Sequence, residues 1–257
     1  MLQAGTLSSR LYDNLRSKSS GITVEDIRIG LGYIGVRLGG NRVGLAAVLR
    51  HELAPGCTTI HKAGTLKGRP ASELLKYLVA GRNPLDKAIG LAAANALIEY
   101  NASAEEDTVA LLHLTDRDRV AMVGMFRPLL KKIKATGAEL SVIERDPARM
   151  EIADEQAKRN ILRKCTVAVI TATTMLTDTL EGILNTMGNP RHVVLLGPST
   201  PLCSDIFEDT VVTHLGGSSV IDSNKILQII SEGGGTPAMR SHLKFVTVLT
   251  SNRKEKR

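Results

Sequence analysis

The sequence contains no tryptophan, and only three phenylalanines and four tyrosines among its 257 residues. Proteins that hold single-stranded nucleic acid stack its bases on aromatic side chains, so this shortage argues against such a platform. Three cysteines stand far apart, at Cys57, Cys165 and Cys203. Their number and spacing exclude a disulfide framework and a paired-cysteine zinc site, and we expect reduced thiols.

Long apolar runs are also missing. No stretch approaches the roughly 18 to 20 consecutive apolar residues that cross a membrane, and residues 1–18 lack the apolar core of a signal peptide. We therefore expect a soluble, cytoplasmic protein with no membrane partner. The GxSxG, HExxH and P-loop lysine motifs are absent too, so the common hydrolase and nucleoside-triphosphatase classes lack support.

The remaining composition is that of a globular protein, with 43% apolar and 23% charged residues. The length suits two modest domains or one large domain. The formal net charge of +7 is spread unevenly: residues 1–105 carry 13 basic and 8 acidic side chains, and the rest carry 20 and 18. The tail 253–257 supplies +3 of this charge. This distribution favours a surface that attracts small anions, and we expect no nucleic-acid partner.

Residues 1–105 are predicted to form a small α+β domain. Leu7, Leu11 and Leu15 recur every four residues and favour an opening helix over residues 8–18. Segments rich in β-formers follow, separated by glycine and asparagine, and then two helices that start at or after prolines. The expected strands cover residues 22–29, 33–38 and 43–49, and the expected helices cover residues 72–79 and 84–100.

The polar segment 101–107 is the expected domain boundary, because strands and helices alternate beyond it. This alternation predicts a parallel sheet with right-handed crossovers, a Rossmann-like α/β domain over residues 106–257 that ends in a basic tail. Strands are expected at residues 119–123, 139–143, 167–170, 193–196 and 210–214, with an edge strand at 244–250. Helices are expected near residues 127–136, 148–164, 178–187 and 222–231.

Ligands of open parallel sheets bind beyond the carboxyl ends of the strands. The five segments at these ends, the last being residues 215–219, are rich in glycine, hydroxyl or carboxylate groups. Each one alone is explained more simply as a helix cap, but five at one edge favour a pocket. The candidate ligand-binding residues are Gly124, Phe126, Arg127, Thr171, Thr173, Thr174, Gly197, Pro198, Ser199 and Thr200. The candidate acids, bases or hard-cation ligands are Glu144 and Asp146.

Glu144 follows Gly124 by 20 residues, the separation at which dinucleotide-binding folds place the acid that binds ribose. The GxGxxG pattern itself is missing, since only Gly124 is present. Met125, Phe126 and Pro128 fill a loop whose backbone should approach a pyrophosphate closely. Ordinary NAD binding is therefore disfavoured, and a different small ligand at the same edge stays open.

His51, Cys57 and His61 form a separate cluster in the sequence, and Pro55-Gly56 could bend the chain between them. Imidazole and thiolate are good ligands for zinc and softer metals. The spacing matches no closed structural site, so a loop with unrelated polar residues is the simpler interpretation.

Seven short segments in this order resemble the family of putative heavy-metal chelatases, over roughly residues 10–235. They are residues 63–68, 83–85, 90–96, 123–128, 144–147, 171–174 and 197–201. The resemblance implies an enolase-amino-terminal-like domain followed by a Rossmann-like domain, with the active site in the cleft between them. It also implies a role in handling heavy metals or metal chelates.

Met125 and Arg127 depart from the family pattern, which has an aromatic residue or histidine before the phenylalanine and a second proline after it. Arg127 would add a cation suited to a carboxylate or phosphate. In this interpretation Asn95 from the first domain would close the site. Asp222, at the start of the last expected helix, is either a helix cap or a further residue of the cleft.

The leading hypothesis is a two-domain protein that binds a small anionic metabolite or metal chelate in the interdomain cleft. One alternative is a nucleotide- or S-adenosylmethionine-linked enzyme that uses Glu144 on a ribose. A second is a non-catalytic metal-binding module. The only cofactor class that the sequence suggests is a transition-metal ion or metal chelate. Catalysis and the oligomeric state, a homo-oligomer included, stay open.

Overall fold

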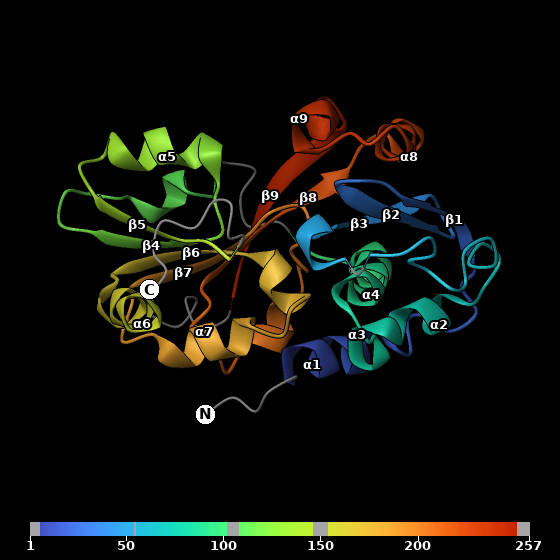
Figure 1. Cartoon of the computed structure of the whole chain (residues 1–257), viewed down its shortest axis with the longest axis horizontal. Helices are drawn as coiled ribbons and strands as arrows, with labels where there is room; N and C mark the ends of the chain where they lie inside the picture. Colours follow the sequence, from blue (N-terminus) through green and yellow to red (C-terminus); the bar gives the residue numbers. More distant parts are fainter. Residues whose placement is uncertain (1–5, 54, 102–107, 146–153, 251–257) are drawn as a thin grey trace.

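A computed structural model of the chain describes residues 6–53, 55–101, 108–145 and 154–250 (Figure 1). The α-helices are α1 (Thr6–Leu15), α2 (Ala71–Leu75), α3 (Tyr77–Ala80), α4 (Pro84–Leu97), α5 (Arg127–Lys134), α6 (Glu155–Lys164), α7 (Leu180–Thr186), α8 (Ser223–Ser231) and α9 (Thr236–Met239). The strands are β1 (Val24–Ile29), β2 (Tyr33–Leu38), β3 (Arg42–Ala47), β4 (Arg119–Val123), β5 (Glu139–Ile143), β6 (Val167–Thr171), β7 (His192–Leu196), β8 (His214–Val220) and β9 (Leu243–Leu249). Short 3-10 turns are η1 (Arg50–Glu52), η2 (Ala110–Leu112), η4 (Ala172–Met175), η5 (Ser204–Phe207) and η6 (Arg240–His242).

The first sheet is an antiparallel meander in the order β1-β2-β3. The alanine-rich helix α4 packs on one face of it, and α8, from the carboxy-terminal part of the chain, packs on the other (Figure 1). The contact with α8 is close: a Cβ atom at Gly30 would lie 2.0 Å from the carbonyl oxygen of Ile230. A helix far along the chain therefore completes this sheet.

The second sheet has six strands in the order β5-β4-β6-β7-β8-β9. The first five are parallel, and β9 runs antiparallel to β8. Helix α5 covers one face, and α6 and α7 cover the other (Figure 1). Taken along the chain, the five parallel strands have the order 2-1-3-4-5, a doubly wound arrangement whose direction reverses between β4 and β6. The predicted α/β class, with a small antiparallel sheet and a larger, mostly parallel one, is confirmed.

The expected strands 119–123 and 139–143 have the observed bounds of β4 and β5. The strand expected at residues 210–214 is wrong, because β8 begins where that prediction ends. Residues 215–219, expected as a ligand-binding loop, therefore lie within β8. Gly216 and Gly217 suggested a break between secondary-structure elements, but both lie within β8. Side chains pack closely against them there, since a Cβ at Gly216 would be 2.5 Å from Leu196 Cδ1.

Buried side chains from both halves of the chain form one continuous apolar cluster, which includes Leu7 and Leu11 of α1 and Ile170 of β6. Polar contacts accompany it, since the Leu7 N–H donates to Glu181 (3.1 Å) and Arg10 pairs with Asp209 (3.2 Å). No helix in the described ranges is both long enough and apolar enough to cross a lipid bilayer. The basic tail and most of the expected boundary segment lie outside the described residues.

Candidate functional site

A cavity of about 560 Å³ opens at the carboxyl ends of β4, β5 and β6. It lies beside the reversal point between β4 and β6, where doubly wound sheets bind their ligands. The end of β3 and the η1 turn form the opposite wall, so both halves of the chain contribute. The lining residues are Val48, Leu49, Arg50, His51, Gly124, Met125, Phe126, Glu144, Thr171 and Thr173.

Gly124 shapes the floor of this cavity. Its φ of +82° is disfavoured for residues with side chains, and a Cβ there would lie 2.7 Å from Thr171 Cγ2. The close approach leaves the Thr171 hydroxyl next to that of Thr173, with the two oxygens 3.0 Å apart. Both threonines line the cavity, and each hydroxyl has further hydrogen-bonding capacity.

Glu144 is held by the backbone. One carboxylate oxygen accepts the N–H of Met125 (3.0 Å), and the other accepts the N–H of Arg145 (2.7 Å). The neighbouring amides are also engaged: Gly124 N–H donates to the carbonyl of Ile143, and Phe126 N–H donates to a sulfur atom. These are the amides that a pyrophosphate would need, so the geometry gives no support to the nucleotide-binding alternative.

Arg50 brings a positive charge to the cavity wall. Arg50 is exposed, and its guanidinium makes no hydrogen bond or ion pair with any part of the chain that the structure describes. Glu52 follows it in η1 and accepts an ion pair from Arg145 (3.0 Å), while the His51 ring lies 3.6 Å from the same carboxylate oxygen. The Glu52–Arg145 pair links η1 to the segment after β5. Because Glu52 and Glu144 are both engaged within the protein, Arg50 is the charge left for a ligand.

The Gly197–Thr200 segment is not part of the lining of this cavity, and it joins the two halves of the chain. Ser199 is buried, and its hydroxyl accepts the N–H of Ala47 (2.8 Å). Asn95 donates from Nδ2 to the carbonyls of Leu45 (2.8 Å) and Ser199 (3.1 Å). Asn95, Ser199 and the buried Thr200 therefore do not line the cavity with Thr171 as we expected. Gly197 and Pro198 are not among the lining residues either.

Three other candidate positions are not among the lining residues. Thr174 is buried and donates to the carbonyl of Thr171 (2.7 Å). Arg127 is exposed at the first residue of α5, next to Phe126. Asp222 caps α8 by accepting the N–H of Lys225 (2.9 Å), so its role as a cap is the observed one. Asp146 lies outside the described residues.

The predicted metal ligands His51, Cys57 and His61 are not brought together. Across residues 6–53, 55–101, 108–145 and 154–250, no three His, Cys, Asp or Glu side chains lie close enough to hold a metal ion. All three residues are exposed, and only His51 reaches the cavity. The described residues therefore do not fit a metal ion bound by the protein alone.

Sequence patterns did not identify Val48, Leu49 and Arg50 as cavity residues. Val48 and Leu49 end the expected strand of residues 43–49, and Arg50 follows it. An arginine next to a strand end was the available signal. Their place opposite β4 and β6 depends on how the two sheets pack, which no local pattern specifies.

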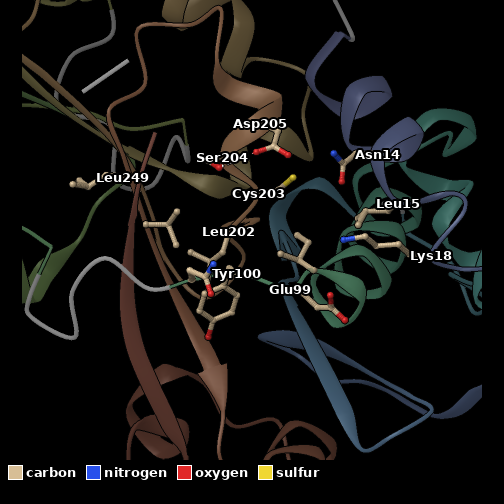
Figure 2. A pocket seen from close by; sticks show the side chains of 13 residues that line it. Asn14, Leu15, Lys18, Glu99, Tyr100, Leu202, Cys203, Ser204, Asp205 and Leu249 are labelled. Carbon is tan, nitrogen blue, oxygen red and sulfur yellow. Dashed lines mark hydrogen bonds between the residues drawn. The ribbon is translucent and has the colours of Figure 1, made fainter. Parts of the chain in front are cut away.

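A second cavity, of about 440 Å³, shares no lining residue with the first. It lies where the end of α1, the segment after α4, the segment before η5 and the end of β9 meet (Figure 2). Its polar lining residues are Asn14, Lys18, Glu99, Tyr100, Asn101, Cys203, Ser204 and Asp205. Burial and the Asp205 charge raise the pKa of the Cys203 thiol, and the Lys18 charge opposes them.

The fold is that of an α/β protein, and its first cavity, which is large enough for a small ligand, lies between a small antiparallel sheet and a doubly wound sheet. Two family models, both described as "Putative heavy-metal chelation", match residues 107–249 and 12–98. The first model alone covers more than half of the 257 residues. The chain belongs to this heavy-metal chelation family, as its sequence motifs suggested.

Relatives of the chain give the fold but name no ligand. An uncharacterised protein of Methanocaldococcus jannaschii is 25% identical over 150 residues, which span 56% of this chain and 58% of that protein. A family member of unknown function from Pyrococcus horikoshii has a TM-score of 0.81 at 21% identity, covering 95% of this chain and all of that one. Another from Desulfitobacterium hafniense has a TM-score of 0.69 at 24% identity, covering 94% and 100%.

Proposed function

We propose that this protein binds a small anionic metal chelate in the cavity between β3 and the carboxyl ends of β4, β5 and β6. The observation that carries this proposal is the position of Arg50, a cation without a partner among the described residues, on the rim of a cavity at the sheet's reversal point. The family's description adds the metal. A volume of about 560 Å³ falls within the range of small-molecule sites.

The metal is the cargo in this proposal, and it arrives inside its own chelator. No three-residue metal site exists among the described residues, so the protein recognises the anionic groups of the chelator. Arg50 supplies charge, Thr171 and Thr173 supply hydroxyl groups, and Phe126 and Val48 supply apolar surface. Glu144 holds the Met125 loop in place through its amide hydrogen bonds.

The proposal divides the chain into residues 1–105 and 106–257, with one addition. Helix α8 of the second part packs on the sheet of the first. The cavity therefore lies between two units that also share this helix, which limits how far they can separate.

Isothermal titration calorimetry with ferric citrate tests the proposal, together with citrate alone and ferric ion alone. We expect the chelate to bind, and a hundredfold excess over its Kd to stabilise the protein by about 2.7 kcal/mol in thermal unfolding. Arg50→Ala should weaken binding roughly tenfold, because it removes a charge-assisted contact. Thr171→Val, which keeps the side-chain shape, should weaken it less.

Arg159→Ala is the matched control, since Arg159 is an exposed arginine of α6 outside the cavity. It should bind ferric citrate like the wild type. Binding that is unchanged in Arg50→Ala, or no binding of either chelate or citrate, would contradict the proposal.

A further inference from the structure

The second cavity brings together four segments that are distant in sequence, and its lining is mostly polar, with an apolar floor. Leu15, Leu202 and Val248 are buried beneath it. Its side chains come from both halves of the chain (Figure 2). A volume of about 440 Å³ suits a small molecule.

Charges of both signs line this cavity. Lys18, Glu99 and Asp205 are all exposed, so solvent and solutes reach them. None of the three forms an ion pair with the parts of the chain that the structure describes. Asp205 does accept a hydrogen bond from the neighbouring Ser204 hydroxyl (3.0 Å). Opposite charges in one cavity that do not reach each other leave room for a ligand that contacts both.

The charges of Lys18 and Asp205 both affect the Cys203 thiol in the cavity wall. The Cys203 thiol lies close enough to feel both, because Asp205 raises its pKa and Lys18 lowers it. Figure 2 shows Cys203, Lys18 and Asp205 around the same space. Lys18 and Asp205 thus lie near the same thiol, and Glu99 is a further carboxylate in the lining of this cavity.

We propose that this cavity is a second binding site, for a diamino carboxylic acid such as a dibasic amino acid. Its lining carries two negative charges and one positive charge, and a dibasic amino acid carries the complement: two ammonium groups and one carboxylate. The carboxylate pairs with Lys18, the ammonium groups pair with Glu99 and Asp205, and the methylene chain lies on the apolar floor. No metal set is available here among the described residues, since Cys203, Asp205 and Glu99 form no such group.

The site is independent of the proposed chelate cavity, because the two have no lining residue in common. Isothermal titration calorimetry at low ionic strength with three compounds tests it. L-Lysine carries all three charges, L-norleucine lacks the second ammonium group, and cadaverine lacks the carboxylate. We expect L-lysine to bind roughly tenfold more tightly than either of the others.

Lys18→Met should reduce L-lysine affinity to that of cadaverine and leave cadaverine binding intact. Glu99→Gln should weaken L-lysine and cadaverine together. Lys67→Met, at an exposed lysine outside the cavity, is the matched control and should bind as the wild type does. Equal binding of L-lysine and L-norleucine, no binding of L-lysine, or unchanged L-lysine binding in Lys18→Met would overturn the proposal.

The two proposals are distinguished by testing each variant with the ligand of the other cavity. Lys18→Met should bind ferric citrate normally, and Arg50→Ala should bind L-lysine normally. A failure of ferric citrate binding therefore leaves the L-lysine result standing, and the reverse also holds.

Discussion

Gly124 shows how one residue sets the form of the first cavity. The chain leaves β4 there with a positive φ, and the absent side chain lets Thr171 approach. Both properties act together, since an alanine would have to adopt a strained backbone and also displace the threonine. The cavity floor and the local backbone conformation thus depend on the same position.

Gly124→Ala should lower the free energy of unfolding by about 1–3 kcal/mol, because strain and the contact with Thr171 both oppose it. Gly182→Ala is the matched control: Gly182 lies inside α7, where an added Cβ would meet no atom within 4 Å. That change should raise stability by about 0.5–1 kcal/mol. Urea unfolding of both variants measures these effects, and a destabilised Gly182→Ala or an unaffected Gly124→Ala would contradict this explanation.

At the scale of elements, an ion pair ties together the amino ends of β4, β6 and β7, at the edge of the sheet opposite the cavity. Arg191 binds both carboxylate oxygens of Asp118, at 3.0 and 2.7 Å. The Thr166 hydroxyl donates to the same carboxylate (2.8 Å). The Arg191 guanidinium holds the pKa of the Asp118 carboxyl well below its usual range, against the effect of burial.

Asp118→Asn should destabilise the protein by about 3 kcal/mol near neutral pH. This value is at the lower end of the range for breaking a buried ion pair, because Arg191 is partly exposed. Asp118 stabilises the fold above the pKa of an unfolded aspartate, about 3.9, and this contribution is lost as the pH falls toward the lower folded value. The stability difference between wild type and variant should therefore narrow below about pH 4.

Denaturant unfolding from pH 7 to pH 2.5 follows this difference. Asp116→Asn is the control, since Asp116 is exposed in the same turn. A gap between wild type and Asp118→Asn that stays constant down to the lowest pH would show that the carboxylate charge is not the source of the stabilisation.

Hydrophobic periodicity, together with breaks at glycine, proline and asparagine, predicted most helices and strands. The strands at 119–123 and 139–143 were predicted without error because each is a short apolar run before a turn or helix. The strand β8 was misplaced because Gly216 and Gly217 are ordinary turn residues in isolation. They occupy a strand here because Leu196 and Leu202 pack against positions that have no side chain. Only tertiary packing distinguishes these two meanings of a glycine pair.

The lining of the first cavity was predicted only in part, because this too depends on tertiary packing. Strand ends located Gly124, Phe126, Glu144, Thr171 and Thr173, all of which line the cavity. The rule of strand ends also selected Ser199 and Thr200, yet their segment faces β3 and α4 and is buried there. Which strand ends remain open depends on where the first sheet docks, and that information is spread over the whole chain.

At the scale of the molecule, the two halves share a core, and helix α8 of the second half packs on the sheet of the first. Ile226 and Ile230 of α8 are fully buried with Leu45 of β3, and α1 packs beside η5. The small sheet therefore has one apolar face that only the second half covers. We expect the full chain to unfold in a single thermal transition.

A fragment of residues 1–101 should not fold alone, because it exposes the face that α8 covers. Circular dichroism and amide proton spectra of the fragment measure this, with the full chain as the reference. In the full chain, Ile230→Ala should cost about 2–5 kcal/mol as a buried cavity-forming change. A fragment with dispersed amide signals and a cooperative melt would contradict the shared-core description.

The position of α8 also sets an order of events during protein synthesis. The meander leaves the ribosome early, but the helix that covers it is made only after most of the chain has been translated. Ribosomes add about 5–20 residues per second, so the uncovered apolar face persists for many seconds. We therefore expect the amino-terminal sheet of a nascent chain to present an apolar face of the kind that chaperones bind, and slow translation between β3 and α8 would prolong that exposure.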